Sequence, residues 1–342
     1  MINEPMTLQS RRSMLQRLAL ASLGFALSCV RPRSLGAESQ GDAMNNESSK
    51  GRLQAIDQVV TVRERHWVGD GFYVSTVFSP HRMNPQTLSP FILMDYGAPR
   101  HFPPTTERRG VGEHPHRGFE TVTFAYQGEV DHRDSYGGGG TIQAGDVQWM
   151  TAASGVVHEE FHSEAFRKLG GLFEMVQLWV NLPGSLKLTA PRYQALKGAS
   201  FPQIRLGDAK ARLIAGSLGG QKGPALTHTP ITMFDMNCVD GATAEFELAP
   251  GTTTLVFVLS GTAVAQGARA LRAGDLMIMK RDEHGRVQLK ADSGTRVLVL
   301  NGQPLNEPVV AHGPFVMNSR QEIVEAIQDY QAGKMGTLAP TL

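Results

Sequence analysis

Two short segments of the sequence carry histidine and glutamate at alternate positions. GEHPHRGFETVTF contains His114 and His116, and SGVVHEEFH contains His158 and Glu160. Successive side chains of a β-strand point to opposite faces, so the two residues of each pair share a face. Two such strands facing each other in a barrel would bring three imidazoles and a carboxylate together and leave coordination positions open. The spacing therefore marks these four residues as potential ligands of one metal ion.

The donor set limits the metal without choosing it. Neutral imidazole and carboxylate suit iron, manganese, nickel, copper or zinc. The absence of cysteine from both segments argues against a closed structural zinc site. Glu120 would share the face of His114 and His116 if no bulge intervenes, so it is a rival carboxylate. His132 and Asp134 precede a run of glycines, and we expect them to shape that hairpin rather than to contact a substrate.

The elements that must position these residues are predicted to be strands. The chain has 342 residues, of which 41% are hydrophobic, 19% are charged and 37 are glycine. This composition indicates a globular protein with many turns and enough length for two cores. Short apolar runs such as GFYVSTVF and FILMDYGA are separated by glycine and proline, as in an all-β fold. The formal net charge is +1 and no basic run is interleaved with aromatics, so nothing indicates a nucleic-acid partner.

A weak internal repeat predicts two barrels. FAYQG begins at Phe124 and is followed by GDVQWM from Gly145, whereas FVLSG begins at Phe257 and is followed by GDLMIM from Gly274. The offset is 133 residues for the first motif and 129 for the second. A strand, a glycine turn and a second strand recur in the same order, which is typical of a small antiparallel barrel built twice. We therefore predict two stacked β-barrels.

The two predicted barrels differ in their content. The N-terminal, metal-binding barrel is expected over residues 53–190 and the C-terminal barrel over residues 200–336. The repeat offsets map the four potential ligands onto positions that cannot rebuild the cluster, namely Glu247, Ala249, Val287 and Leu289. We therefore expect one metal ion per chain and a metal-free second barrel.

One helix is predicted, near the carboxyl end. Ser319 and Glu322 have the spacing of a capping box, and Gly333 or Gly336 would end the helix. The residues that share its apolar face are Ile323, Ala326, Ile327 and Tyr330. The predicted fold class is therefore all-β, with two barrels and a short C-terminal helix.

The first 37 residues are typical of a targeting segment. Arg11 and Arg12 precede an apolar run from Leu18 to Val30, which is shorter than the about 20 residues that span a bilayer. This order resembles a twin-arginine export signal, with small residues near its end as a cleavage point. We expect export to the periplasm, with membrane contact only through the signal.

The segment after the signal and the two cysteines add further expectations. Residues 38–52 are polar and are expected to form a flexible linker. The cysteines are Cys29, inside the signal, and Cys238. Removal of the signal would leave one thiol, so no internal disulfide is expected. A lipid anchor through Cys29 is the alternative to free release into the periplasm.

These residues carry a resemblance to the pirin family, a bicupin branch of the cupin superfamily. The matching strings are HPHRGFETVTF, GDVQWMTAASGVVHEE, VQLWVNLP and GQPLNEPVVAHGPFVMNSRQEI. The resemblance implies that a metal is bound by His114, His116, His158 and Glu160. Pirins keep the glutamate that corresponds to Glu120 but bind the metal through the later one. The implied metal is Fe(II), with Mn, Ni, Cu, Co or Zn as alternatives.

The resemblance also implies an activity. Bacterial pirins are associated with quercetin 2,3-dioxygenase activity, so the partners would be O₂ and a small planar aromatic substrate. Glu160 would be both a ligand and the catalytic base that accepts the proton of the flavonol 3-hydroxyl. The residues expected to line an apolar pocket for the substrate are Phe91, Met94, Phe119 and Trp149. The alternative function is that of a metal-loaded, redox-sensing pirin that binds or regulates other proteins without turnover.

Overall fold

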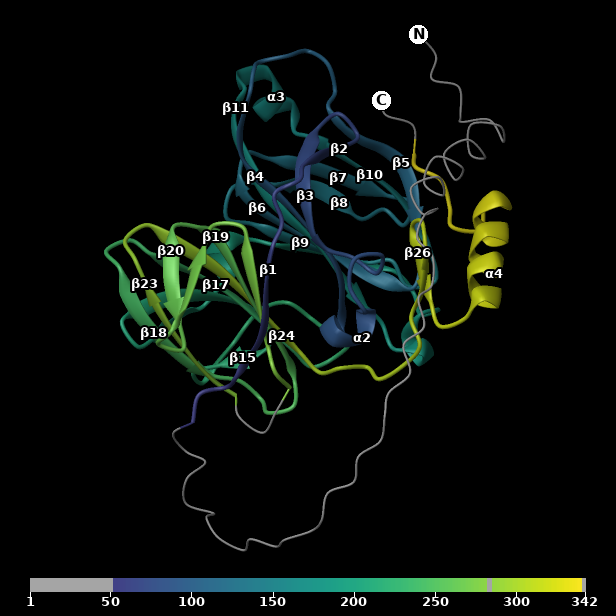
Figure 1. The fold of residues 1–342 in the computed structure, drawn as a ribbon. Helices are drawn as coiled ribbons and strands as arrows, with labels where there is room; N and C mark the ends of the chain where they lie inside the picture. The colour runs from purple at the N-terminus through teal and green to yellow at the C-terminus, as the bar shows by residue number, and fades with distance from the viewer. Residues whose placement is uncertain (1–51, 282–284, 340–342) are drawn as a thin grey trace, which may run out of the picture. The chain divides into compact units, whose positions relative to one another are not determined.

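The structure, a computed structural model, describes residues 52–281 and 285–339. Strands dominate these residues and form two β-barrels, which a carboxyl-terminal helix follows (Figure 1). The predicted all-β fold with two barrels is therefore confirmed. The predicted export signal, residues 1–37, and nearly all of the predicted linker lie outside the described residues. Within the described ranges, no helix combines the length and the apolar composition that crossing a membrane requires.

The first barrel consists of a seven-stranded and a four-stranded antiparallel sheet. The order is β12-β9-β6-β11-β4-β3-β2 in the large sheet and β5-β10-β7-β8 in the small one. The strands of the large sheet are β2 (His66–Val68), β3 (Phe72–Phe78), β4 (Phe91–Phe102), β6 (Phe119–Gln127), β9 (Val147–Thr151), β11 (Gly171–Asn181) and β12 (Arg192–Leu196). The strands of the small sheet are β5 (Gly110–His116), β7 (Val130–Asp134), β8 (Gly139–Ile142) and β10 (Val156–His162). Two short helices, α2 (Pro85–Leu88) and α3 (Glu164–Leu169), lie in connections of this barrel.

The second barrel repeats this arrangement. Its large sheet has the order β1-β22-β19-β24-β17-β14-β13 and its small sheet the order β18-β23-β20-β21. The strands of the large sheet are β1 (Ile56–Thr61), β13 (Gln203–Leu206), β14 (Ala209–Ala215), β17 (Ile231–Cys238), β19 (Thr253–Ser260), β22 (Asp275–Met279) and β24 (Thr295–Gly302). The strands of the small sheet are β18 (Ala242–Glu247), β20 (Thr262–Ala265), β21 (Arg269–Arg272) and β23 (Arg286–Ala291). A small hairpin pairs β15 (Ser217–Leu218) with β16 (Gln221–Lys222). The repeat strands, β6 with β9 and β19 with β22, occupy equivalent places in the two large sheets.

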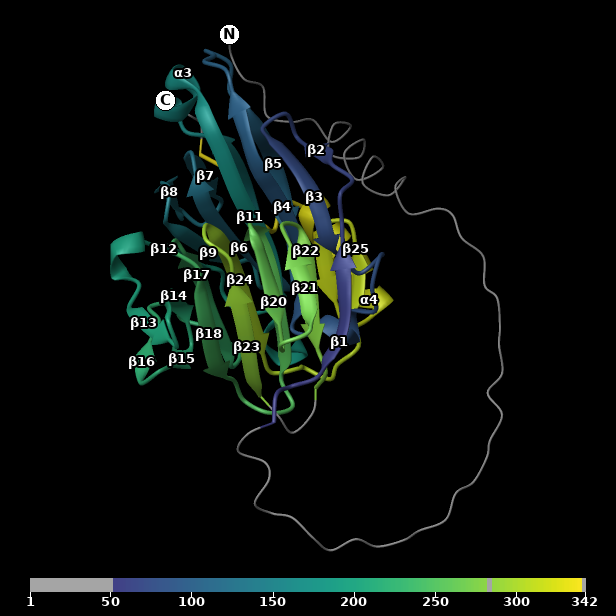
Figure 2. The ribbon, with the colours of Figure 1, turned by 60° about the vertical axis from the view of Figure 1, so that its left-hand side comes forward.

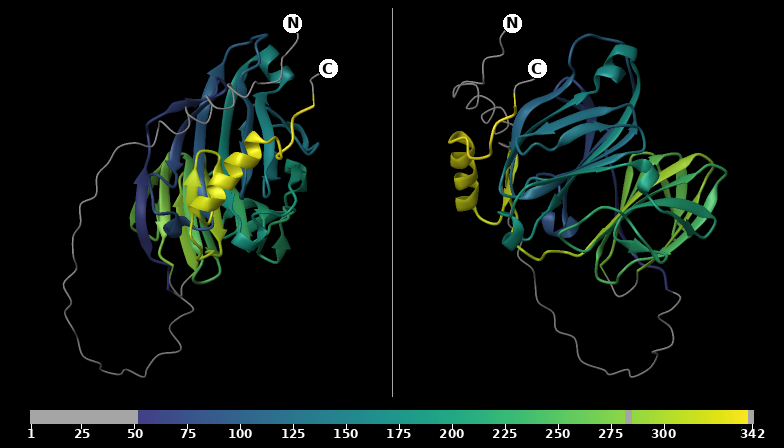
Figure 3. Two further views of the ribbon diagram at one scale, coloured as in Figure 1. Left: turned by 90° about the vertical axis from the view of Figure 1, so that its right-hand side faces the viewer. Right: turned by 180° about the vertical axis from the view of Figure 1, so that it is seen from behind.

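The two large sheets pack against each other around one apolar core (Figure 3). Val122 and Phe124 of β6 belong to the same buried cluster as Leu255 and Phe257 of β19. Alternation along the strand turns the intervening residues toward the barrel interiors, and Val256 accordingly belongs to a separate cluster inside the second barrel. Each large apolar side chain of this kind stabilises the fold by about 2 kcal/mol through its removal from water.

Strand pairing crosses the predicted domain limits at both ends. β1, the first described strand, pairs with β22 of the second barrel, from Ile56 opposite Met279 to Thr61 opposite Asp275 (Figure 2). This pairing covers an edge of β22 that would otherwise be open to another chain. At the other end, the hairpin of β25 (Val310–His312) and β26 (Phe315–Met317) bridges to the first barrel, where Phe315 pairs with Arg117.

The predicted helix is α4 (Arg320–Gln331). The Ser319 hydroxyl accepts a hydrogen bond from the Glu322 backbone N–H, and the Glu322 carboxylate accepts one from the Ser319 N–H, so the predicted capping box is confirmed. The buried residues of its apolar face are Ile323, Ala326 and Tyr330. Gly333 follows the helix with a φ of 75°, the left-handed conformation in which glycine often ends a helix.

Candidate metal centre

Three strands of the small sheet bring the predicted ligands together. β10 lies between β5 and β7, so His158 is opposite His114 on one side and opposite Asp134 on the other. The pairing of β10 with β5 shifts its register between His158 and Glu160. The pairing with β7 continues and places Glu160 opposite His132. Histidines therefore flank β10 on both sides.

The side chains form two overlapping groups with the spacing of metal ligands. Ring nitrogens of His114, His116 and His158 lie within 4.8 Å of one another. The same limit holds for ligand atoms of His132, His158 and Glu160. His158 belongs to both groups, so the other three predicted ligands, His114, His116 and Glu160, lie near it. His132, which we expected only to shape a hairpin, lies there as well.

Burial keeps the three predicted imidazole ligands neutral. His116 and His158 are buried, and His114 is half-buried. Loss of hydration lowers the pKa of His114 to about 4 and lowers the pKa values of His116 and His158 well below their usual range. Each ring therefore has a free lone pair at neutral pH, as metal coordination requires. The Nε2 atom of His158 is buried and has no hydrogen-bond partner within the described residues, which fits a cation site.

Backbone carbonyls fix the tautomers of the first two histidines. Nδ1 of His114 lies 2.8 Å from the carbonyl oxygen of Gly112, and Nδ1 of His116 lies 3.3 Å from that of Pro314. A carbonyl oxygen only accepts, so Nδ1 carries the proton in both rings. Nε2 of each ring is therefore left as the ligand atom, which is the usual arrangement around a bound metal.

A chain of polar side chains fixes the tautomer of His158. Oδ1 of Asp134 accepts hydrogen bonds of 2.8 and 2.9 Å from the backbone N–H groups of Tyr136 and Gly138. Burial raises the pKa of Asp134, but hydrogen bonds from His132 and these N–H groups outweigh that effect and hold it below its usual value. The carboxylate Oδ2 therefore accepts from Nε2 of His132 at 3.4 Å. Nδ1 of His132 can then accept from Nδ1 of His158, also at 3.4 Å, which leaves the His158 Nε2 lone pair free.

Two glutamines hold the carboxylate of Glu160. Nε2 of Gln148 donates to Oε1 at 2.5 Å, and Nε2 of Gln177 donates to Oε2 at 3.2 Å. The Thr123 hydroxyl donates to the Gln177 amide oxygen, and the Tyr193 hydroxyl donates to that of Gln148, so both amides are oriented. Burial nevertheless raises the pKa of Glu160. A cation beside it would favour the charged form again.

Glu120 belongs to neither group of ligand atoms. β5 ends at His116 and β6 begins at Phe119, and Gly118 between them has a φ of 88°. The alternation of faces therefore does not continue from one strand to the next. Residues of β6 with the parity of Glu120 belong to the core between the large sheets, and its Oε1 accepts a 2.6 Å hydrogen bond from the Thr151 hydroxyl. The condition under which Glu120 would share the face of the histidines, an uninterrupted strand, is thus not met.

Most residues expected to line a substrate pocket lie elsewhere. Those found in the core between the large sheets are Phe91, Met94 and Trp149. Phe119 does lie at the site, with its ring 5.0 Å from that of His116. Trp179 stacks on Phe119 at 4.3 Å and lies 5.2 Å from His116. The wall beside His116 is therefore aromatic, but Phe119 is the one predicted residue that belongs to it, and Trp179 was not predicted.

The carboxyl-terminal segment of the chain reaches the ligand strands. We call residues 310–339 the C-terminal strap; its hairpin lies beside β5, and α4 packs on the hairpin (Figure 1). The strap supplies the Pro314 carbonyl that accepts from His116. Asp329 of α4 accepts a 2.9 Å hydrogen bond from Arg117, the residue after that ligand. The last part of the chain therefore supports the first barrel.

Lys187 connects the strap to two parts of the first barrel. Its side chain is buried, with 1% of the residue exposed. Nζ donates to the carbonyl oxygen of Gly118 at 2.7 Å, to Oδ1 of Asn181 at 2.6 Å and to the carbonyl oxygen of Val316 at 2.9 Å. These three acceptors use all three ammonium protons. The β5–β6 turn, the end of β11 and β26 are thus held by one cation.

The residues that hold Glu160 were not predicted, although the internal repeat of the sequence contained an indication of them. The repeat offsets map Thr123 onto Val256 and Gln148 onto Met277. Both positions lie on the barrel-facing side of their strands, where the second barrel has apolar residues. Polar residues in the first copy stand at positions where the second copy has apolar residues. This difference was the available indication of a special site.

The positions that correspond to the ligands in the second barrel have different surroundings. Val287 and Leu289 are buried in the apolar cluster inside this barrel, and Glu247 and Ala249 are exposed. Within the described ranges, both groups of side chains that could hold a metal ion lie in the first barrel.

Family models match both halves of the chain. The model described as Pirin matches residues 72–180, and the model described as Pirin C-terminal cupin domain matches residues 233–336. The first match contains every residue of the two ligand groups. The second contains most of the second barrel together with the hairpin and helix of the strap.

Related proteins cover most of the chain. The chain is 52% identical over 272 residues to a Pseudomonas aeruginosa protein with the provisional name quercetin 2,3-dioxygenase, covering 79% of this chain and 94% of that protein. It is 33% identical over 258 residues to human pirin, covering 73% of this chain and 84% of pirin. A crystal structure of a quercetin 2,3-dioxygenase from Acinetobacter baumannii matches with a TM-score of 0.81 and 50% identity, covering 84% of this chain and 100% of that one.

Replacement of Glu120 by glutamine should remove a pH-dependent loss of stability. Burial raises the pKa of Glu120 from 4.5 to about 7, and the Thr151 hydroxyl opposes the rise. The folded state holds the acid neutral while the unfolded chain releases the proton, so stability falls as the pH rises through this interval. A shift of this size corresponds to roughly 3 kcal/mol. Chemical denaturation at several pH values should show that Glu120→Gln lacks this fall.

The same variant tests whether Glu120 is a ligand. We expect Glu120→Gln to keep the wild-type content of divalent metal by elemental analysis, whereas the matched Glu160→Gln should lose metal. If Glu120→Gln lost its metal and Glu160→Gln kept it, the placement of Glu120 outside the metal centre would be wrong.

Replacement of Lys187 by methionine should loosen the strap. Three buried oxygen acceptors would lose their donor, and we expect the free energy of unfolding to fall by about 3 kcal/mol. The rate at which a bound divalent ion passes to a chelator should rise, because the Pro314 carbonyl would no longer be held against His116. Lys334→Met, on an exposed ion pair of the same strap, is the control and should change neither quantity. Equal effects of the two variants would refute this role of Lys187.

Proposed function

The chain belongs to the pirin family, and we propose that it is a metal-dependent dioxygenase of the quercetin 2,3-dioxygenase type, which opens a flavonol-like ring with O₂. The observation that carries this proposal is that the neutral imidazoles of His114 and His116 and the carboxylate of Glu160 all lie near the neutral imidazole of His158. The 52% identity to a relative with that provisional name supports the same class of reaction. The partners would be O₂ and a small planar aromatic molecule.

We propose that one divalent metal ion, with Fe(II) as the first choice, is held in the first barrel. The proposed ligands are His114, His116, His158 and Glu160. Imidazole and carboxylate donors suit this metal as well as manganese, nickel, copper, cobalt and zinc, so the donor set alone does not choose. A bound ion would supply a Lewis acid that lowers the pKa of the flavonol 3-hydroxyl.

Glu160 is the proposed proton acceptor. Its Oε1 is engaged by the 2.5 Å hydrogen bond from Gln148, whereas Oε2 accepts one longer hydrogen bond, of 3.2 Å, from Gln177. Oε2 is therefore the atom to take the hydroxyl proton. The two amides would hold the carboxyl group in place during that transfer.

The surroundings of His116 suit a planar substrate. Phe119 and Trp179 stack with an angle of 30° between their planes and form an apolar wall. An aromatic ring that packs on this wall would be removed from water and oriented at the same time. His114 is half-buried, so this side of the site is the one open to solvent.

Turnover of quercetin tests the proposal. Full-length protein loaded in turn with iron, manganese, nickel, copper and cobalt should bleach the flavonol absorption band under air. We expect His158→Ala to contain less metal by elemental analysis and to bleach quercetin at least about 100-fold more slowly. The reason is that His158 belongs to both ligand groups. The matched control His101→Ala, at an exposed histidine of β4, should behave as wild type.

The outcome separates enzyme from binding protein. Wild-type protein that holds stoichiometric metal but bleaches quercetin with none of the five ions would overturn the dioxygenase proposal. The second candidate, a metal-loaded pirin that binds or regulates other proteins, would then take its place.

We also propose that the chain is exported by the twin-arginine route to the periplasm. The support is the Arg11–Arg12 pair before a short apolar run. Substitution of both arginines by lysine should leave the protein in the cytoplasmic fraction, as followed by fractionation and immunoblotting. Undiminished export of the double variant would refute this route, and labelling of Cys29 by a fatty-acid probe would favour the lipid anchor instead.

A further inference from the structure

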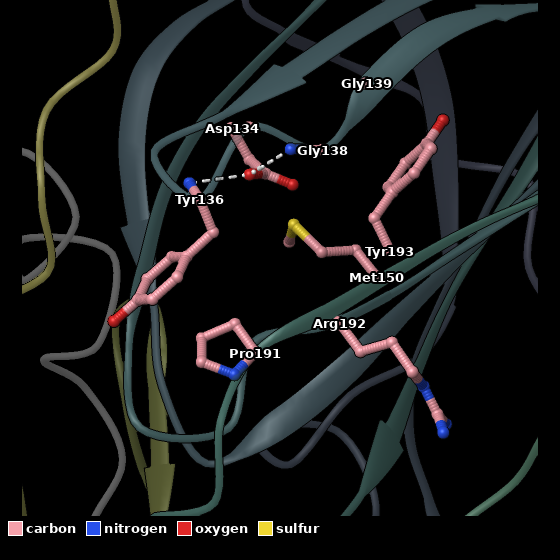
Figure 4. A pocket seen from close by; sticks show the side chains of 9 residues that line it. Asp134, Tyr136, Gly138, Gly139, Met150, Pro191, Arg192 and Tyr193 are labelled. Carbon is pink, nitrogen blue, oxygen red and sulfur yellow. Dashed lines mark hydrogen bonds between the residues drawn. The ribbon is translucent and has the colours of Figure 1, made fainter.

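A pocket of about 330 Å³ lies at the edge of the first barrel (Figure 4). The turn between β7 and β8 forms one side, and β9 with the start of β12 forms the other. The lining residues that matter here are Asp134, Tyr136, Met150, Pro191 and Tyr193. Its volume is at the lower end of the range of small-molecule sites. We call it the Tyr136 pocket.

The Tyr136 pocket is separate from the candidate metal centre. The ring of Tyr193 lies nearly parallel to that of His132, at 4.8 Å and an angle of 11°. The His132 ring lies 5.1 Å from that of His158. Two aromatic layers therefore stand between the pocket and the nearest proposed ligand, so a molecule in the pocket cannot coordinate the metal.

The lining selects a small ring. Figure 4 shows Tyr136 and Tyr193 on opposite sides, with the Met150 sulfur and the Pro191 ring between them. Aromatic rings, the methionine thioether and the proline ring all pack well on the face of a flat ligand ring. Tyr136 is 55% exposed although it is a large aromatic residue, so a ligand ring would cover surface that is now open to water.

The Asp134 carboxylate in the pocket selects a hydrogen-bond donor. Oδ1 of Asp134 is occupied by the N–H groups of Tyr136 and Gly138. Oδ2 makes one long contact, of 3.4 Å, with His132 and retains capacity for a second donor. A phenolic hydroxyl combines that donor with a flat ring. Arg192 also lines the pocket. Its guanidinium group donates to the carbonyl oxygen of Leu226 at 2.7 Å and points away from Asp134 in Figure 4, so a carboxylate or phosphate beside Asp134 would be repelled.

The walls of the pocket are connected to two proposed ligands. The Tyr193 hydroxyl donates to Gln148 at 3.2 Å, and Gln148 in turn donates to Glu160. Asp134 contacts His132, which contacts His158. A molecule that shifts either wall therefore acts on a group one contact away from a ligand, and affinity effects between two such sites are reciprocal.

We propose that the Tyr136 pocket is a second binding site, which takes a small uncharged phenol, and that its occupancy is coupled to metal binding. The coupling rests on the proposed metal centre, whereas binding of the phenol does not. The site gives the protein a way to sense an aromatic compound at a position where that compound is not a substrate.

Resorcinol is a suitable probe because its two hydroxyls are too far apart to chelate one ion. We expect saturable binding to metal-free full-length protein by ligand-observed NMR. 1,3-Dimethoxybenzene, which has the same ring but no donor, should bind about tenfold more weakly. Tyr136→Ala should weaken resorcinol binding about fivefold, and Trp67→Ala, at another exposed aromatic residue, should leave it unchanged.

The coupling has its own measurement. The dissociation constants of resorcinol for Ni(II)-loaded and metal-free wild type should differ about fivefold. Tyr193→Phe keeps the ring but removes the hydroxyl that reaches Gln148, so this difference should become smaller, and the part that remains would be carried by Asp134 and His132.

Each outcome bears on one part of the proposal. Absence of saturable binding, or equal weakening by Tyr136→Ala and Trp67→Ala, would overturn the site. Equal constants for loaded and metal-free wild type would overturn the coupling. Failure of quercetin turnover would leave the binding result in metal-free protein standing, so the two proposals fail separately.

Discussion

The register of β10 between its two neighbours is the constraint on which the candidate site depends. Side chains alternate along a strand, so a slip of one residue would turn His158 and Glu160 out of the barrel together. The pairing with β7 is continuous, whereas the pairing with β5 breaks just after His158 lies opposite His114. At that break β5 approaches very closely, because a Cβ on Gly110 would lie 2.1 Å from the carbonyl oxygen of Glu160. A side chain at Gly110 would collide with the backbone of β10, so this close pairing of β5 with β10 requires glycine.

The two barrels differ in one cross-strand row that faces the barrel interior. In the first barrel this row on β9, β6 and β11 is Gln148, Thr123 and Gln177. In the second barrel the equivalent row on β22, β19 and β24 is Met277, Val256 and Val299. The apolar row stabilises its barrel through burial, at roughly 2 kcal/mol for each side chain. The polar row lacks this stabilisation by burial. The amide groups of Gln148 and Gln177 instead donate hydrogen bonds to the Glu160 carboxylate. The same fold thus packs a core in one copy and supports Glu160 in the other.

Local rules were enough to predict part of this arrangement. Alternation within a strand predicted that His114 and His116 share a face, and capping chemistry predicted the start of α4 at Ser319. Alternation did not extend to Glu120, because a turn with a left-handed glycine interrupts the strand. The hydrogen bond from His116 to Pro314 joins residues 198 apart, and no local pattern announces it. What the sequence left unpredicted therefore lies in turns and in contacts between distant segments.

The energetics of the cluster explain why a site of this kind tolerates burial. The imidazoles avoid the cost of desolvation by remaining neutral, and Glu160 avoids part of it by a raised pKa. A cation beside Glu160 would favour its charged form and so oppose the effect of burial. The fold itself does not need the binding energy of a cation, because the core between the large sheets is apolar and independent of the cluster. The two faces of β6 therefore have different roles. Val122 and Phe124 on one face pack in the apolar core, and Thr123 on the other face belongs to the polar side chains around Glu160.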